Sequence, residues 1–252
     1  MATYVIGDLH GCYDAWMELQ DKIESKDKQA KYILLGDIED RGPDGYKLIK
    51  WARNNITDDG KYQMVMGNHE KIKIDWRDEN IKELEYYGDE ITHDGVLTVY
   101  PEQYSIVSQY QEQTGREDIY DELWDDIDWM ETLPYYKDIT VGDRRCIITH
   151  ASLPASVINK DGTLKTELTH HQKESIVWDR DFNVEFTSIP NAILINGHTP
   201  TFTINGCDGH IYKVKNRYTI DCGAVFRITK GYKNANLAAL RLEDLKEIYL
   251  WK

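Results

Sequence analysis

Five short apolar runs, each closed by glycine or other polar residues, constrain this chain more than any other feature of its sequence. They occupy residues 4–6, 32–35, 64–66, 146–149 and 192–195. Runs of this length, rich in aliphatic and β-branched residues and ended by turn-forming residues, are typical of buried strands. Strands that deliver polar residues at their C-terminal ends predict a layered α/β fold whose site lies at those ends.

Helical patterns separate the first three runs. Residues 14–25 place Trp16, Leu19 and Ile23 on one face, and residues 43–56 begin with Pro43, which suits a first helical turn. The chain therefore starts as βαβαβ. The C-terminal third is rich in strand-like residues between turn signals, and we expect two packed sheets with late strands at 212–214, 218–220, 238–242 and 247–251.

Residues 77–133 differ from their surroundings because they are strongly acidic and helical in pattern. Apolar positions 119, 123, 124, 127 and 130 form one stripe, and carboxylates fill the remaining face. We interpret this segment as a helical insertion over the strand ends. The alternative is an ordinary solvated amphipathic helix with no part in substrate choice. No repeat and no long linker interrupts the chain, so we expect a single domain over residues 1–252.

Composition narrows the classes of protein. The 30 Lys and Arg against 44 Asp and Glu give a net charge of −14, which argues against stable nucleic-acid binding. No apolar run is long enough to cross a membrane, and the first residues lack the basic start of a signal peptide. The four cysteines show no paired spacing, which indicates reduced thiols and a cytoplasmic location.

Metal-ligating residues follow the five runs in order. Two carboxylates, one amide oxygen and three imidazoles are available from Asp8, His10, Asp37, Asn68, His150 and His198. This mixed oxygen and nitrogen set, without a thiolate, suits manganese, iron or zinc. Six ligands exceed what one catalytic metal usually takes from protein. A pair of divalent ions that share a carboxylate uses them better, and such pairs act on phosphorus.

Other polar residues near these ligands suit proton transfer and anion binding. His69 stands beside Asn68, and a histidine held by an aspartate such as Asp40 can deliver a proton to a leaving oxygen. Arg41 and Arg180 each offer a planar fork that fits phosphoryl oxygens.

The motifs in this order resemble a known family. Residues 7–11 (GDLHG), 36–42 (GDIEDRG) and 67–70 (GNHE) are similar to the signatures of the phosphoprotein phosphatase (PPP) family of metallophosphoesterases. The resemblance continues through residues 149–151, 178–180, 197–200 and 220–226, and the compact length is closest to the bacterial and bacteriophage branch that includes lambda phosphatase. It implies the calcineurin-like metallophosphoesterase fold, with a central β-sandwich flanked by helices.

The resemblance also implies roles. Asp8, His10 and Asp37 would hold the first metal, with Asp37 bridging to a second metal held by Asn68, His150 and His198. His69 with Asp40 would be the general-acid dyad, and Arg41 and Arg180 would bind phosphate. Two divalent ions are expected, manganese before iron or zinc. The chain departs from many relatives at Met66, where they carry arginine, and at Ala151-Ser152, where many eukaryotic members carry two glycines.

We therefore expect a metal-dependent phosphomonoesterase, foremost a protein Ser/Thr phosphatase that acts on phosphoproteins or phosphopeptides, with phosphotyrosine as a further substrate. The alternative is a symmetrical dinucleoside tetraphosphatase or another nucleotide or RNA-end phosphatase. A binding module without catalysis is disfavoured because no ligand or acid residue is missing. The sequence leaves the oligomeric state open.

Overall fold

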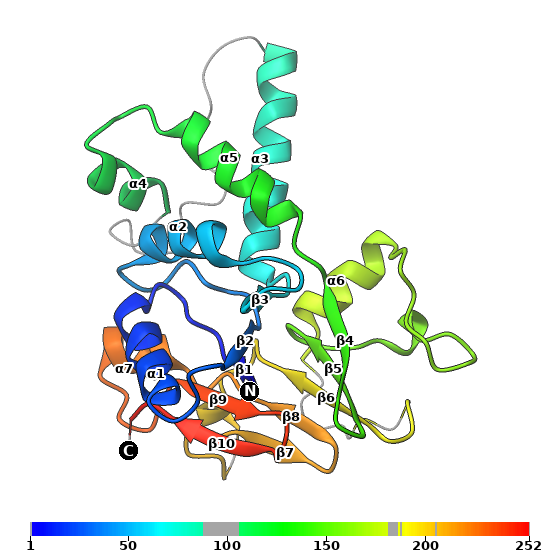
Figure 1. Cartoon of the computed structure of the whole chain (residues 1–252). Coiled ribbons are helices and arrows are strands. Elements are labelled where there is room, and N and C mark those ends of the chain that lie inside the picture. Colours follow the sequence, from blue (N-terminus) through cyan, green and yellow to red (C-terminus); the bar gives the residue numbers. More distant parts are fainter. Residues whose placement is uncertain (1, 88–105, 181–185, 187, 205, 252) are drawn as a thin grey trace.

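Two five-stranded sheets form the centre of the described structure, a computed structural model that covers residues 2–87, 106–180, 186, 188–204 and 206–251 (Figure 1). The first sheet has the order β10-β9-β1-β2-β3 and comprises β1 (Thr3–Ile6), β2 (Lys31–Leu34), β3 (Tyr62–Met64), β9 (Ala238–Arg241) and β10 (Lys246–Tyr249). The second has the order β4-β5-β6-β8-β7 and comprises β4 (Tyr136–Val141), β5 (Arg144–Thr149), β6 (Ala192–Asn196), β7 (Tyr212–Val214) and β8 (Arg217–Thr219).

Alternation along the central strands separates two apolar layers. Val5 and Ile33 belong to a cluster that also contains Ile148 and Ile195 of the second sheet, which is the core between the sheets. Their neighbours on β1 and β2 belong to the cluster shared with the helices. Because successive strand residues point to opposite faces, a strand buried on both faces is apolar without interruption. The apolar runs in the sequence show this uninterrupted pattern.

Helices cover the outer faces. On the first sheet, α1 (Tyr13–Glu24) and α2 (Gly45–Asn55) pack through Trp16, whose ring meets Tyr32 edge-on at 5.3 Å between centroids. α6 (His170–Trp178) lies beside β5, and α7 (Ala224–Lys230) follows β8. Two short 3-10 helices occupy Ala155–Val157 and Thr201–Thr203.

The acidic segment forms helices that extend from the sandwich. α3 (Asn68–Tyr87) rises from the end of β3, and α4 (Ile106–Thr114) and α5 (Tyr120–Glu131) pack against α2 and α3 at the top of Figure 1. Asp126 of α5 is fully buried and accepts from Lys50 and from Arg53 of α2, the latter at 2.7 Å. The part of the predicted insertion at 88–105 lies outside the described residues.

The predicted fold is confirmed: four of the five runs are strands, the third (64–66) overlaps β3 only at Met64, the late strands exist, and the first two helices stand where predicted. Three elements were not predicted, namely β4, α6 and α7. The start of α6 carries a visible signal, because Thr169 and Gln172 form a capping box. Within the described residues, no helix combines the length and the apolar character that crossing a membrane requires.

Candidate metal centre and active site

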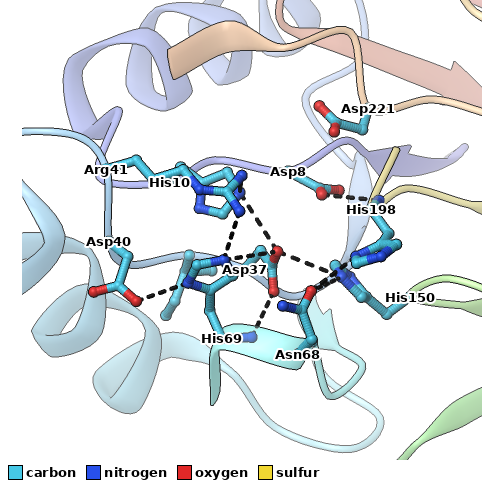
Figure 2. A network of polar contacts seen from close by, with 12 residues as sticks. Asp8, His10, Asp37, Asp40, Arg41, Asn68, His69, His150, His198 and Asp221 are labelled. Atoms are coloured by element: carbon cyan, nitrogen blue, oxygen red, sulfur yellow. Dashed lines mark hydrogen bonds and ion pairs between the residues drawn. The ribbon is translucent and has the colours of Figure 1, made fainter. Parts of the chain in front are cut away.

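The ends of five strands bring the predicted ligands to one place (Figure 2). Asp8 follows β1, Asp37 follows β2 and Asn68 opens α3 after β3, while His150 and His198 follow β5 and β6 of the other sheet. All five are buried. Both sheets contribute because β1, β2 and β3 are parallel, as are β5 and β6, so their C-terminal ends meet at one edge of the sandwich.

Asp37 lies at the centre of this cluster. Its Oδ2 is 3.4 Å from His10 Nε2 and 3.4 Å from His150 Nε2, and its Oδ1 accepts from the His69 backbone N–H at 3.0 Å. Burial opposes ionisation, yet the His150, His69 and His10 imidazoles together bring the pKa of Asp37 well below its usual range. An ionised carboxylate between two sets of imidazoles is the position that a bridging ligand needs.

A second set of donors gathers around Asn68. Its Oδ1 is 2.9 Å from His150 Nε2 and 2.9 Å from His198 Nδ1. Among the described residues, two groups of ligand atoms lie close enough to hold an ion: His10, Asp37 and His69 form one, and Asp37, His150 and His198 form the other. The two groups share Asp37, which fits a pair of cations.

Asp8 stands beside these groups rather than within them. Its Oδ2 accepts from the His198 backbone N–H at 2.9 Å, while its Oδ1 is buried and has no hydrogen-bond partner among the described residues. Burial and the neighbouring Asp221 carboxylate raise the pKa of Asp8 well above its usual range. A buried, unsatisfied carboxylate oxygen beside a like charge is costly in protein alone, and a divalent cation would offset that cost.

The histidines also suit metal binding. Burial, and then the positive charge of His150, lower the pKa of His198 to about 3, so its ring is neutral near pH 7. Burial and Arg41 likewise lower the pKa of His10. At His150 burial acts against protonation, but the Asp37 carboxylate raises the pKa to about 10. A cation in this position would replace that proton, because a metal and a proton compete for the same ring nitrogen.

Backbone strain is concentrated here. Of the eight described non-glycine residues with positive φ, five belong to the predicted site: His10, Asp37, Asp40, Arg41 and His198. Each such residue costs on the order of 1–3 kcal/mol and persists only where the surroundings fix it. The polar side chains of the site therefore point toward one place, and the cost is strain in the local backbone.

Glu70 fixes the loops that carry Asp37 and Asn68. Its carboxylate accepts from the backbone N–H groups of Asp37, Ile38 and Gly67, each at 2.9 Å. Gly67 is required in this arrangement, because a Cβ there would lie 2.4 Å from Asp37 Oδ1 and 2.4 Å from Glu70 Oε2. Sequence analysis placed Glu70 in a motif but gave it no task.

The predicted acid residue lies beside the ligand cluster. His69 Nδ1 is 2.7 Å from Asp40 Oδ2, so the ring donates from Nδ1 to that carboxylate. Its Nε2 accepts from Arg41 at 2.8 Å, and Arg41 also contacts His10 Nε2 at 2.9 Å. The guanidinium thus lies among the ligands, where it can reach an anion bound to the same centre.

The insertion reaches the loop that carries Asp40 and Arg41. Gln109 of α4 is buried, and its Nε2 donates to Gly42 O at 3.1 Å while its Oε1 accepts from Tyr46 N at 3.1 Å. α4 therefore contacts this loop through a buried side chain.

Trp178 and Arg180 lie at the rim near His198. Trp178 is 39% exposed, and its ring meets the His198 ring edge-on at 5.9 Å between centroids. Arg180 is exposed and is one of the charges that lower the pKa of His198. Unlike Arg41, Arg180 is not inside the buried cluster.

Besides Glu70, sequence reasoning gave no role to Asp221 and Lys73, which are buried at the site. Asp221 belongs to a motif that was recognised without a role, and burial raises its pKa to about 6. Lys73 donates to Asp40 and belongs to no motif. The only sequence signal for Lys73 is its spacing of four residues after His69, which places both on one face of a helix.

Comparison with known proteins places this fold and site in a family. The family model for calcineurin-like phosphoesterases matches residues 1–215, so the chain belongs to the calcineurin-like phosphoesterase family. With its buried His and Asp clusters, it is a metal-dependent phosphoesterase.

The individual proteins that this chain resembles differ in sequence identity and in the share of the chain that they match. A symmetrical bis(5'-nucleosyl)-tetraphosphatase of Methylobacillus flagellatus is 37% identical over 70 residues, which are 28% of this chain and 24% of that protein. A protein serine/threonine phosphatase from Saccharomyces cerevisiae matches in structure with a TM-score of 0.58 at 12% identity, over 99% of this chain and 78% of that one. A cold-active protein-tyrosine phosphatase of Shewanella has a TM-score of 0.51 at 17% identity, over 98% and 80%. At such identities these two structures show the fold alone.

Proposed function

We propose that this phosphoesterase hydrolyses dinucleoside polyphosphates, with a symmetrical dinucleoside tetraphosphate as its preferred substrate. The observation that carries the proposal is the 37% identity over 70 residues to a symmetrical bis(5'-nucleosyl)-tetraphosphatase. The nucleotide alternative thus takes precedence over the protein phosphatase that the motifs first suggested, because the phosphatase structures share only the fold at 12% and 17% identity.

The exposed indole of Trp178 supports a substrate that carries a base. It stands against His198 at the rim of the buried cluster, with 39% of its surface accessible. An exposed aromatic ring beside a phosphate-binding centre offers a stacking surface for a purine, and Arg180, two residues after the end of α6, offers a cationic fork for a phosphate. A phosphoserine side chain has no flat group to use such a surface.

The metal ligands are assigned as the family resemblance implies. Asp8, His10 and Asp37 would hold one cation, and Asn68, His150 and His198 with Asp37 would hold the other. When bound, such a pair of cations supplies an activated water and neutralises charge on the phosphoryl oxygens. Manganese is our preferred ion, with iron and zinc as alternatives.

Arg41 and the dyad lie side by side next to the ligand cluster. Arg41 lies 2.9 Å from His10 Nε2 and 2.8 Å from His69 Nε2, so its fork faces the space where a phosphoryl group binds. Protonated His69 donates a proton to the departing oxygen, and Asp40 stabilises the positive ring through the 2.7 Å contact at Nδ1.

The test compares kcat/KM in Mn²⁺ for diadenosine tetraphosphate and for a phosphoserine peptide. Cleavage at the middle of the tetraphosphate releases two nucleoside diphosphates, so ADP is the expected product of the dinucleotide. Preference for the peptide, with no ADP formed, would replace this proposal by the protein phosphatase.

The contribution of Trp178 is tested with Trp178→Ala. Base stacking on an aromatic side chain is worth about 1–3 kcal/mol, so KM for the dinucleotide should rise roughly 5- to 150-fold. The kcat/KM for the phosphoserine peptide, whose phosphorylated side chain has no flat group, should stay near the unsubstituted value. An equal loss on both substrates would mean that Trp178 supports the metal centre instead.

A further inference from the structure

Among the described residues, three buried titratable side chains form a cluster next to His69. Glu39, Asp40 and Lys73 are 0%, 2% and 3% exposed. Lys73 Nζ donates to Asp40 Oδ2 at 2.5 Å and lies 3.3 Å from Glu39 Oε2. Asp40 Oδ2 therefore accepts from two donors, Lys73 Nζ and His69 Nδ1.

Helix geometry explains how both donors reach one oxygen. His69 and Lys73 are four residues apart on α3, so their side chains lie one above the other on the same helix face. Asp40 comes from the loop after β2, 33 residues before Lys73 in sequence. The ammonium and the imidazole hold the carboxylate from two directions.

Stability alone does not account for this cluster. Removing charges from water costs several kcal/mol per ion, and apolar side chains of similar volume in such positions often leave a protein equally or more stable. Burial and the Asp40 carboxylate raise the pKa of Glu39 well above its usual range, so the Lys73 ammonium faces one ionised carboxylate and one neutral acid. The cluster must therefore be useful for what it fixes.

What it fixes is the state of Asp40. Burial alone would favour the neutral acid, and the Lys73 ammonium reverses this and brings the pKa of Asp40 well below its usual range. An ionised Asp40 can only accept, so His69 must carry its proton on Nδ1 and direct Nε2 toward the ligand cluster. Glu39 is connected to the same cluster, because its backbone carbonyl accepts from His10 Nδ1 at 3.0 Å.

We propose that Lys73, held from its other side by Glu39, is a positioning residue that fixes Asp40 and thereby orients His69 for proton donation to the leaving group. The inference deepens the proposed function and rests on the acid role of His69. It predicts that loss of Lys73 lowers kcat most for substrates whose leaving group needs a proton.

Leaving-group dependence separates this role from a merely structural one. p-Nitrophenolate departs readily without a proton, whereas phenolate depends on protonation. We expect the ratio of kcat for p-nitrophenyl phosphate to kcat for phenyl phosphate to rise about tenfold or more in Lys73→Met. His69→Asn should raise the ratio at least as far. Lys73→Arg keeps the positive charge, so its ratio should stay close to that of the unsubstituted enzyme.

Lys71→Met is the matched control. Lys71 is a buried lysine of the same helix, 6% exposed, but it pairs with Asp75 and Glu174 and not with the dyad. Its loss should leave the ratio unchanged. If Lys73→Met folds poorly, the double variant Glu39→Leu/Lys73→Met removes both partners of the 3.3 Å contact together and should still show the raised ratio.

The outcomes are distinct. A raised ratio in His69→Asn with an unchanged ratio in folded Lys73 variants would overturn the inference and leave the proposed acid intact. An unchanged ratio in His69→Asn would overturn the acid role and this inference with it, while ADP formation from the dinucleotide would still decide the substrate.

Discussion

At the scale of single residues, Glu70 shows how the site depends on groups that touch neither metal nor substrate. Its carboxylate collects three backbone N–H groups from two loops, and those loops carry Asp37 and Asn68. A buried N–H that loses its acceptor cannot turn to water instead. The positions of two predicted ligands therefore depend on one side chain.

Glu70→Gln tests this dependence. The amide nitrogen would face a backbone N–H that needs an acceptor, so we expect the free energy of unfolding to fall by about 1–3 kcal/mol. Urea denaturation followed by circular dichroism measures the change. Glu117→Gln, at an exposed position in the turn before α5, should stay within about 0.5 kcal/mol. Equal stability of the two variants would show that the three hydrogen bonds have no net value.

Residue type and spacing predicted which side chains meet, but not what supports them. Asp8, Asp37 and His150 could be predicted because each follows an apolar run that had to be a strand, and parallel strands end together. The contact of Lys73 with Asp40 could not, because it depends on how α3 leaves β3. The task of Glu70 depends on loop geometry, which a motif does not specify.

At the scale of elements, the insertion is tied to the sandwich by a buried charge. Asp126 of α5 has no exposed surface and receives Lys50 and Arg53 of α2 together with the hydroxyl of Tyr110 on α4. A single carboxylate thus connects three helices. The sequence showed the acidic stripe, but it could not distinguish this carboxylate from its solvated neighbours.

Asp126→Ala should separate the helices of the insertion from α2. The change removes the hydrogen bonds from Lys50 and Arg53, but these partners are 26% and 38% exposed and Lys50 keeps its contact with Glu122, so we expect a loss of about 1–3 kcal/mol. The measurement is the free energy of unfolding in urea. Asp125→Ala is the control, since Asp125 is 70% exposed and its nearest contact to Arg53 is 4.0 Å, so a change below about 1 kcal/mol is expected.

The same variant shows whether the insertion supports catalysis. Gln109 of α4 contacts Gly42, next to Arg41. If the insertion supports this loop, folded Asp126→Ala should also lose turnover of p-nitrophenyl phosphate. Full turnover in a destabilised variant would indicate that the Arg41 loop keeps its position without α4.

At the scale of the whole molecule, the predicted metal centre joins the two sheets. Asp8, Asp37 and Asn68 follow strands of the first sheet, whereas His150 and His198 follow strands of the second. Cations held by both sets would connect the two sheets at one edge of the sandwich. The strained loops and the neighbouring carboxylates Asp8 and Asp221 lie at the same edge. Metal binding should then stabilise the entire fold and not only the loops.

The expected gain in stability follows from the linkage between metal binding and folding. A ligand present at 100 times its Kd stabilises the native state by about 2.7 kcal/mol, which corresponds to a rise in Tm of about 5–10 °C for a chain of this size. Thermal unfolding in Mn²⁺ and in a chelator measures the difference. With a net charge of −14, the chain also attracts cations elsewhere on its surface, so a rise in Tm does not by itself locate the ion. Asp37→Asn removes the shared ligand and should abolish the Mn²⁺-dependent rise, whereas Asp125→Ala removes an exposed carboxylate and should retain it. A rise that persists in Asp37→Asn would place the stabilising ion outside the cluster, and the sheets would then be held together by their apolar core alone.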